Sequence, residues 1–237
     1  NSNRPMIKAG IVGGAGYTGG ECCRLLLNHP EVELAFVQSE SNAGNFLYEV
    51  HGDLFGETEM KFTAGIEPDA DVLFFCMGHG RSLKFLEENK VNPATKIVDL
   101  GNDFRLKKDA DASGRHFVYG LPECSRETIR KTDSIANPGC FATAIQLALL
   151  PLAAGGLLKG EVQVSAITGS TGAGQKPSAT THFSWRANNL STYKTFTHQH
   201  LGEIGETVTT LQPTFTKAIN FVPFRGDFPR GIIAAVY

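Results

Sequence analysis

The sequence KAGIVGGAGYTGGECCRLLLN at residues 8–28 decides the fold of the first half of the chain. It opens with a short apolar run, Lys8 to Val12, that ends in glycines, as a buried parallel strand does. A helical pattern follows from Tyr17 to Asn28 and stops at His29-Pro30. The stretch therefore predicts a strand, a tight glycine turn and a helix.

The pattern of strand and helix repeats further along the chain. Strands are predicted at Val32–Gln38, Asp71–Met77 and Lys96–Leu100, and a helix at Arg81–Asn89. Such alternation with short connections is typical of a doubly wound parallel sheet. We therefore predict a Rossmann-like, dinucleotide-binding domain over residues 6–137 and an α/β fold class.

The pattern changes near residue 137, which predicts a second, mixed α+β catalytic domain over residues 138–237. Its predicted elements are a helix at Phe141–Ala154, a β-rich run at Glu161–Thr168, a long polar loop at Gly169–Thr192, a helix at Gly202–Leu211, and strands at Lys217–Val222 and Gly231–Tyr237. A loop of that length is usually functional or disordered. Because the sequence ends on a strand-like run, we expect this domain to be incomplete at its C-terminus.

The composition limits the class of protein. The chain has 237 residues, 41% of them hydrophobic and 19% charged, and a formal net charge of −2. Positive and negative charges nearly cancel and no run of basic residues occurs, which argues against a nucleic-acid partner. No apolar run approaches the ~20 residues that a membrane span needs. We expect Met6 to be the start, Asn1–Pro5 an added or disordered tail, and the location cytoplasmic, since no signal peptide precedes Met6.

The glycine turn is a candidate cofactor site. Gly13, Gly16 and Gly19 have the spacing of a turn that lets a pyrophosphate approach the backbone at a helix N-terminus. We predict that they bind a dinucleotide, together with Tyr17 and Thr18 between them.

The end of the second predicted strand bears on which dinucleotide is bound. An acidic residue there would hold the ribose of NAD, but the strand closes at Ser39, and Glu40 comes one step later. Hydroxyls of Ser39 or Ser41 suit the 2′-phosphate of NADP. NADP is therefore favoured, while Glu40 keeps NAD open.

Cys140 is the candidate nucleophile among five cysteines, an odd number without CxxC pairs, which argues against disulfides and a metal site. Pro138-Gly139 places it at the start of a helix, where unpaired N–H groups favour the thiolate. The same groups, with Asn137, could stabilise an oxyanion. Cys22 and Cys23 lie in a predicted amphipathic helix and Cys76 in an apolar strand, and all three are interpreted as structural.

A thiolate of this kind needs a proton partner. His198 and His200, just before the predicted helix at Gly202–Leu211, are the best candidates, and the sequence leaves the choice between them open. Glu203, three residues after His200, could orient the ring.

Several segments resemble the N-acetyl-gamma-glutamyl-phosphate reductase family, part of the group that includes aspartate-semialdehyde dehydrogenase. They are GIVGGAGYTGGE at 10–21, SESNAG at 39–44, MGHGRS at 77–82, DLGNDFRL at 99–106, YGLPE at 119–123, ANPGCFAT at 136–143, STGAG at 170–174, HQHLGEI at 198–204 and FVPFRGDFPRGI at 221–232. Together they cover essentially the whole chain. Three residues depart from the family's pattern: Glu40, Gly202 and Phe224.

The resemblance implies a step toward arginine, in which NADPH reduces an N-acylated glutamyl 5-phosphate to the semialdehyde through a thioester on Cys140. It implies a homo-oligomer (dimer or tetramer) and adds site residues. Arg105 and Glu203 would bind substrate, and the cofactor site would gain His79, Gly80, Ser170, Gly172 and Gly174. The acyl group, acetyl or a relative such as succinyl, stays open.

Three other functions compete with this interpretation. One is the same chemistry on aspartyl phosphate, and another is an NADP-binding sensor without catalysis. A Cys–His hydrolase is disfavoured because it would leave the glycine turn without a purpose.

Overall fold

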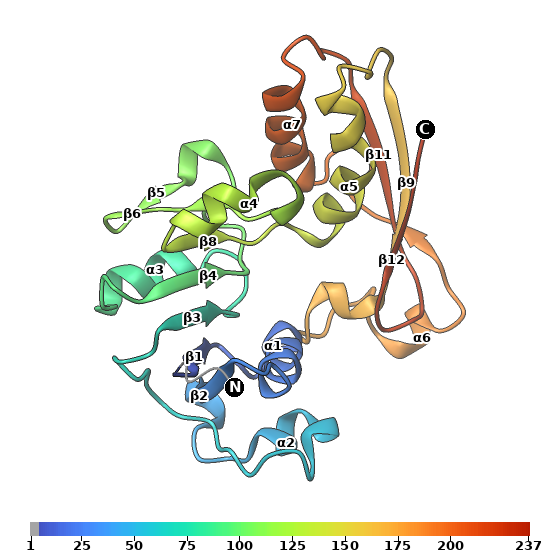
Figure 1. Ribbon diagram of the computed structural model, residues 1–237. Helices are drawn as coiled ribbons and strands as arrows, with labels where there is room; N and C mark the ends of the chain where they lie inside the picture. Colours follow the sequence, from blue (N-terminus) through green and yellow to red (C-terminus); the bar gives the residue numbers. More distant parts are fainter. Residues whose placement is uncertain (1–4) are drawn as a thin grey trace. The chain divides into compact units, whose positions relative to one another are not determined.

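A parallel sheet organises the N-terminal half of the chain in the computed structural model, which describes residues 5–237 (Figure 1). The tail expected at Asn1–Pro5 therefore lies, except for Pro5, outside the described residues. Six strands form the sheet in the order β2-β1-β3-β4-β8-β7, and every pair is parallel. Their bounds are β1 Ile7–Val12, β2 Val32–Gln38, β3 Val72–Phe75, β4 Lys96–Asp99, β7 Val118–Tyr119 and β8 Ser134–Ala136.

Helices pack against both faces of this sheet, so it is doubly wound as predicted. Helix α1 (Tyr17–Leu27) packs on the face that includes Ala9 and Ile11 of β1. Helix α3 (Ser82–Glu88) packs on the face that includes Val12. Alternate β1 side chains thus enter two separate apolar cores, which explains why the strand is apolar throughout.

The segment between β4 and β8 has structure that the sequence analysis missed. It contains the helical turn η3 (Lys107–Asp109), the hairpin strands β5 (Asp111–Ala112) and β6 (Arg115–His116), and helix α4 (Pro122–Lys131), besides β7. These three strands have only two residues each, too few to show a period of two. Between β2 and β3 lie three further short elements that were also missed: η1 (Glu40–Asn42), α2 (Leu47–Val50) and η2 (Gly52–Leu54).

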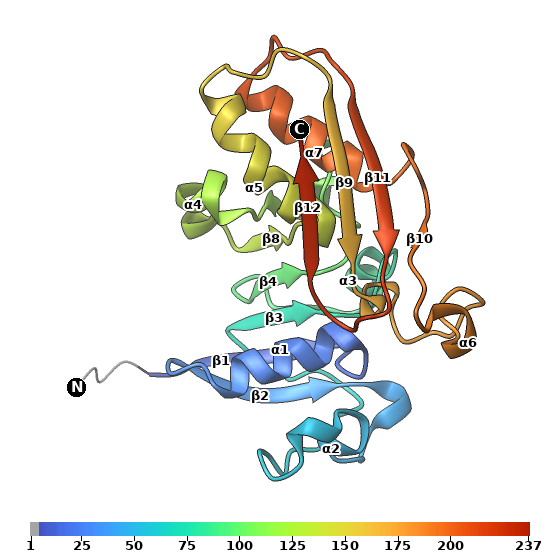
Figure 2. The same ribbon diagram turned by 90° about the vertical axis from the view of Figure 1, so that its right-hand side faces the viewer.

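A mixed four-stranded sheet organises the C-terminal half, in the order β10-β11-β9-β12. Strands β9 (Val162–Thr168) and β11 (Ile219–Arg225) are parallel, while β10 (Ser191–Thr192) and β12 (Ile232–Val236) pair antiparallel at the two edges. Helices α5 (Cys140–Ala154) and α7 (His200–Leu211) pack on each other and on one face of this sheet. Figure 2 shows the opposite face turned toward the viewer, with no described helix across it.

The segment Gly169–Thr192, predicted as one long loop, is partly ordered into η4 (Ser170–Ala173), α6 (Phe183–Arg186) and β10. The prediction was wrong in this respect because one buried side chain organises the segment from within. Arg186 is only 6% exposed, and its guanidinium donates to the carbonyl oxygens of Thr180, Asn189 and Arg225. The contact with Arg225, 39 residues away, leaves no local pattern in the sequence.

The chain divides into two compact units. The first comprises the described residues up to Gly120 and Glu127–Asn137, and the second comprises Leu121–Arg126 and Pro138–Tyr237. Helix α4 runs through both, and its backbone departs from helical geometry at Ser125. Within residues 5–237, no helix has the length and apolarity required to cross a membrane.

Candidate functional site

The glycine turn between β1 and α1 has the geometry of an anion site. Gly13 has a φ of +76°, a backbone conformation that favours glycine. A Cβ on Gly19 would lie 2.5 Å from the carbonyl oxygen of Gly14, so α1 packs directly on the turn. Gly16 is the residue immediately before α1. The N–H groups in the first turn of α1 therefore lie near the carboxyl end of β1, where an anion could bind them.

A cavity of about 1010 Å³ lies beside this turn within the first unit. Of the predicted cofactor residues, it is lined by Gly13, Gly16, Ser39 and Ser41. Tyr17, Thr18 and Gly19 lie in the first turn of α1 and are not among the lining residues. Its size and the adjoining helix start fit the bulky, anionic half of a dinucleotide.

The cavity is also lined by two basic residues that were not predicted from the sequence. Arg81 and Lys84, at the start of α3, line the same cavity as Ser41 and Glu40. Lys84 also pairs with Glu88 at 3.5 Å. Their side chains come from a helix more than forty residues away from Ser39 in sequence, which is why the local motif did not indicate them.

Ser39 and Ser41 differ in exposure. Ser39 is buried, and its Oγ accepts a hydrogen bond from Asn42 Nδ2 at 3.4 Å. Ser41 is exposed, and the same amide donates to its Oγ at 3.1 Å. Ser41 therefore has the more accessible hydroxyl for a phosphate.

His79 and Gly80 lie in the loop between β3 and α3. His79 is exposed, and the N–H of Gly80 donates to Asp103 Oδ1 at 2.7 Å. Asp103 also accepts from the N–H of Leu83 at 3.1 Å and so satisfies the start of α3. Neither His79 nor Gly80 lines the cavity, and their cofactor role stays a prediction.

Arg105 and Asn137 contact each other at the end of the first unit. The Nε of Arg105 donates to the carbonyl oxygen of Asn137 at 2.8 Å, and Nη2 donates to that of Leu100 at 3.2 Å. The N–H of Asn137 donates to the carbonyl oxygen of Asp99 at 2.8 Å. Arg105 is 7% exposed, so these contacts support a role in holding the backbone that leads to Cys140. Substrate binding by Arg105 and oxyanion binding by Asn137 stay predictions.

The five cysteines differ sharply in environment. Cys22, Cys23 and Cys76 are buried, with the sulfurs of Cys22 and Cys76 3.8 Å apart. Burial raises the pKa of Cys23 to about 12, and the hydrogen bond with Cys22, together with burial, raises the pKa of Cys76. Cys124 is exposed, but its thiol donates to the carbonyl oxygen of Leu121. Cys140 is exposed and is the first residue of α5.

The start of α5 is enclosed by α7. The N–H of Gly139 donates to Glu203 Oε2 at 3.0 Å, and Glu203 is only 4% exposed. A Cβ on Gly139 would lie 2.3 Å from His200 Nε2, so only glycine leaves room for this ring. His200 Nε2 lies 3.9 Å from Glu203 Oε1. The predicted group of Cys140, His200 and Glu203 therefore lies around one helix start.

His198 and His200 have different surroundings. The ring of His198 packs against Phe141, Phe221 and Tyr193, with centroids 5.4 to 5.8 Å away. Its Nδ1 accepts a hydrogen bond from the N–H of His200 at 3.2 Å. Burial, together with the positive charges of Lys194 and Arg225, lowers the pKa of His198 to about 4. His198 is therefore neutral near pH 7 and poorly suited to acid–base work.

Two further side chains of this region, Tyr193 and Arg225, were not predicted from the sequence as site residues. Tyr193 contacts His198, and the guanidinium of Arg225 lies over the Tyr193 ring, 4.6 Å from its centroid. Arg225 projects from the same face of β11 as Phe221, toward the helices, because side chains alternate along a strand. Tyr193 precedes the first residue of β11 by 26 residues, so no short sequence motif contains both Tyr193 and Arg225.

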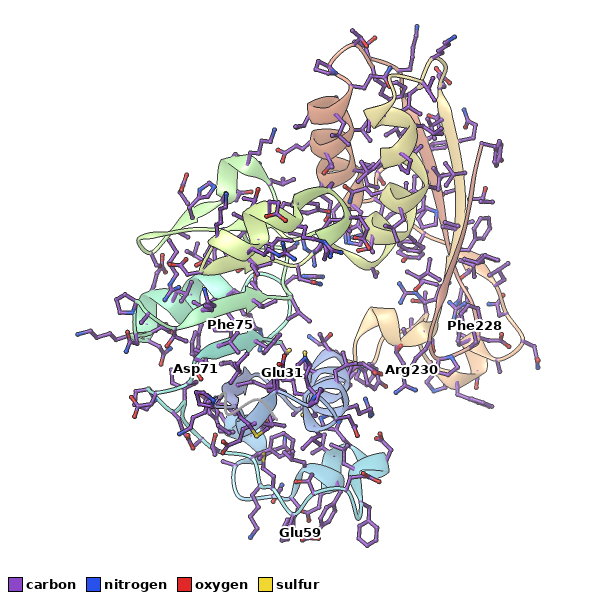
Figure 3. All side chains as sticks on the ribbon, viewed as in Figure 1. Glu31, Glu59, Asp71, Phe75, Phe228 and Arg230 are labelled. Carbon is purple, nitrogen blue, oxygen red and sulfur yellow. The ribbon has the colours of Figure 1, made fainter. Side chains whose placement is uncertain are left out.

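The predicted cofactor residues Ser170, Gly172 and Gly174 lie at η4 in the second unit. The N–H of Ser170 donates to the carbonyl oxygen of Phe228 at 2.8 Å, in the turn between β11 and β12 where Figure 3 labels Phe228 and Arg230. Their contact with a cofactor stays a prediction. Among residues 5–237, no three His, Cys, Asp or Glu side chains gather so as to hold a metal ion.

Two family descriptions match successive parts of the chain. Residues 8–132 match the semialdehyde dehydrogenase NAD binding domain, and residues 140–237 match the semialdehyde dehydrogenase dimerisation domain. The fold is similar to aspartate semialdehyde dehydrogenase II from Vibrio cholerae, with a TM-score of 0.72 at 17% identity over 98% of this chain and 73% of that one.

Curated relatives are much more similar in sequence. N-acetyl-gamma-glutamyl-phosphate reductase of Flavobacterium johnsoniae is 59% identical over 232 residues, and that of Christiangramia forsetii is 58% identical over 232 residues. The enzyme of the same name from Bacteroides thetaiotaomicron is 56% identical. In each case the match covers 98% of this chain and 71% of the relative.

The lowered pKa of His198 predicts how stability depends on pH. Unfolded His198 takes up a proton below about pH 6.5, whereas the folded protein does so only near pH 4, so acidification between these values favours unfolding. His198→Asn keeps an acceptor near Nδ1 but cannot be protonated. We expect the wild type to lose about 3 kcal/mol more free energy of unfolding than this variant between pH 7 and pH 4. Urea titrations at several pH values measure the difference, and parallel pH curves would contradict the prediction.

Proposed function

Since the chain belongs to the N-acetyl-gamma-glutamyl-phosphate reductase family, we propose that it reduces an N-acylated glutamyl 5-phosphate to the semialdehyde, a step toward arginine. The observation that carries this proposal is the position of Cys140 at the start of α5, with His200 and Glu203 around the preceding residue. Because Cys140 is the exposed cysteine that begins a helix, it is the thiol best placed to act as a nucleophile.

The reaction divides into two steps at Cys140. The thiolate attacks the acyl carbon, the carbon–sulfur bond forms, and the bond from that carbon to the phosphate oxygen breaks, which releases phosphate and leaves a thioester. When bound, NADPH supplies the hydride that reduces the thioester. The carbon–sulfur bond then breaks and returns the thiolate with release of the aldehyde. The N–H groups at the start of α5 would stabilise negative charge on the carbonyl oxygen in both steps.

His200 is the proposed acid–base group. It takes the proton from the Cys140 thiol and supplies one to the oxygen that becomes negative on reduction. When the carbon–sulfur bond breaks, it takes that proton back from the hydroxyl as the aldehyde forms. Glu203 accepts the N–H of Gly139 through one carboxylate oxygen and faces His200 with the other. The carboxylate of Glu203 therefore lies between the start of α5 and the His200 ring.

NADP is the proposed dinucleotide. The exposed hydroxyl of Ser41 and the positive charges of Arg81 and Lys84 line one cavity beside the glycine turn, and a 2′-phosphate needs such partners. Glu40 and Glu88 line the same cavity and oppose this preference. Lys84 offsets the charge of Glu88 by pairing with it, which leaves Arg81 to balance Glu40 and meet the phosphate.

A second copy of this chain is the proposed partner of the uncovered face of the second sheet. Side chains on that face form two rows across three strands, Val222–Ser165–Ala235 and Phe224–Ile167–Ile233. Ile233 is 69% exposed, although a large apolar side chain gains from burial. The match of this region to a dimerisation domain supports a homo-oligomer built on this face.

Replacement of Cys140 tests the mechanism. We expect Cys140→Ser to lower phosphate-dependent NADP⁺ reduction with N-acetylglutamate semialdehyde by about 10³-fold or more, because the serine hydroxyl stays protonated. Cys124→Ser is the matched control, since Cys124 is also exposed, and its activity should equal that of the wild type. An active Cys140→Ser variant would refute the mechanism. Faster turnover of aspartate semialdehyde by the wild type would instead favour the aspartyl substrate.

Charge removal in the cavity tests the choice of dinucleotide. We expect Arg81→Gln with Lys84→Gln to raise KM for NADPH by about 10-fold or more and to leave KM for NADH nearly unchanged, since only NADPH has the 2′-phosphate. Lys90→Gln, at an exposed lysine outside the cavity lining, is the control. Equal changes for both dinucleotides would contradict a 2′-phosphate role.

A charge on the uncovered sheet face tests the partner. We expect Ile233→Asp to weaken self-association at least about 100-fold, because an aspartate would be buried without a partner in the interface. Leu157→Asp, at a 60% exposed leucine in the loop after α5, is the control. Light scattering across a dilution series measures the mass, and an unchanged dimer in Ile233→Asp would place the interface elsewhere.

A further inference from the structure

His51 is a buried histidine that neither candidate site uses directly. It follows α2, is 5% exposed, and its Nε2 lies 2.8 Å from the carbonyl oxygen of Gly14. A carbonyl oxygen only accepts hydrogen bonds, so His51 carries the hydrogen on Nε2 and donates it. Gly14 belongs to the glycine turn, 37 residues earlier in the chain.

This hydrogen bond orients the peptide group between Gly14 and Ala15. The group is planar and trans, so its N–H points away from its carbonyl oxygen. With the oxygen directed at His51, the N–H of Ala15 points to the opposite side. Ala15 and Gly16 both line the cavity beside the turn. The histidine therefore controls the direction of a donor at the place where a pyrophosphate would lie.

The rest of the turn is held from the other side by Gln38. Its carbonyl oxygen accepts the N–H of Gly13 at 3.0 Å and that of Gly14 at 2.8 Å. Its side-chain Oε1 lies 3.1 Å from the N–H of Gly13. Gln38 thus accepts hydrogen bonds from the N–H groups of Gly13 and Gly14. The next peptide group, between Gly14 and Ala15, is oriented by its hydrogen bond with His51.

The imidazole occupies a space shaped for it. Its centroid lies 6.2 Å from that of Phe62, and a Cβ on the buried Gly20 would lie only 2.8 Å from its Nδ1. Glycine at position 20 lowers the helix propensity of α1 by about 1 kcal/mol relative to alanine. The ring thus lies directly against the first turns of α1.

We propose that His51 is a positioning residue for dinucleotide binding, which fixes the Gly14–Ala15 peptide through its Nε2–H so that the start of α1 presents its N–H groups to the pyrophosphate. The inference rests on dinucleotide binding at this turn. It assigns the residue no contact with substrate or reacting atoms.

Two substitutions at position 51 separate the hydrogen bond from packing. His51→Gln places an amide donor near the position of Nε2, whereas His51→Leu keeps similar bulk without a donor. We expect the dissociation constant for NADP⁺, measured by calorimetry, to rise about 3- to 10-fold in His51→Leu and to stay near the wild-type value in His51→Gln. KM for NADPH should follow the same order, with kcat at saturation unchanged. His29→Leu, at an exposed histidine of the same unit, is the control.

Gly20→Ala tests the same contact from the other partner. Helix propensity alone predicts a more stable α1, but the added methyl group must displace His51. We therefore expect the dissociation constant for NADP⁺ to rise in Gly20→Ala about as much as in His51→Leu. The thermal stability of Gly20→Ala should not fall below that of the wild type. An equal dissociation constant in wild type and His51→Leu, or equal weakening in the Gln and Leu variants, would overturn the role of the hydrogen bond. Absence of NADP⁺ binding by the wild type would instead refute the proposed function.

Discussion

The hydrogen bond from the N–H of Gly139 to the carboxylate of Glu203 is the contact on which the cysteine site depends. It joins the start of α5 to the first turn of α7, in which Glu203 and His200 are both buried. It requires glycine at position 139, because any side chain would collide with His200. A buried carboxylate is stable only when it is hydrogen-bonded or paired, and the backbone N–H supplies that need. This contact thus ties the helix start that begins with Cys140 to the helical turn that carries His200 and Glu203.

The backbone of the glycine turn in the first unit is likewise held by hydrogen bonds from other segments of the chain. Gln38 and His51 hold the turn by its N–H groups and one carbonyl oxygen, and Gly19 lets α1 pack on it. In both places the proposed site is a helix start, and polar side chains from distant segments bind the backbone before it. This arrangement keeps the donors in place before an anion arrives, which is the condition for strong electrostatic stabilisation.

Features carried by short local patterns could be predicted from the sequence, and features made by distant contacts could not. The alternation of apolar runs and helical patterns predicted the doubly wound sheet, and Pro138-Gly139 predicted the helix start at Cys140. Strand β8 has only three residues, which cannot show a period. Only in the folded chain do Arg81 and Ser41 line one cavity, and only there does Arg225 lie over the ring of Tyr193. The order of the segment after β9 depends on the buried Arg186, whose partners span residues 180 to 225.

The charge of the protein shows why backbone donors matter for its chemistry. An acyl phosphate and NADPH are both strongly anionic, yet the chain has a formal net charge of −2. Long-range attraction therefore contributes little to their capture, and it is screened beyond about 8 Å at physiological ionic strength. The binding energy has to come from contacts at close range, where N–H groups at a helix start carry about half a positive charge without an ionised side chain. Two helix starts, at Tyr17 and Cys140, supply such charge to the proposed cofactor site and the proposed substrate site.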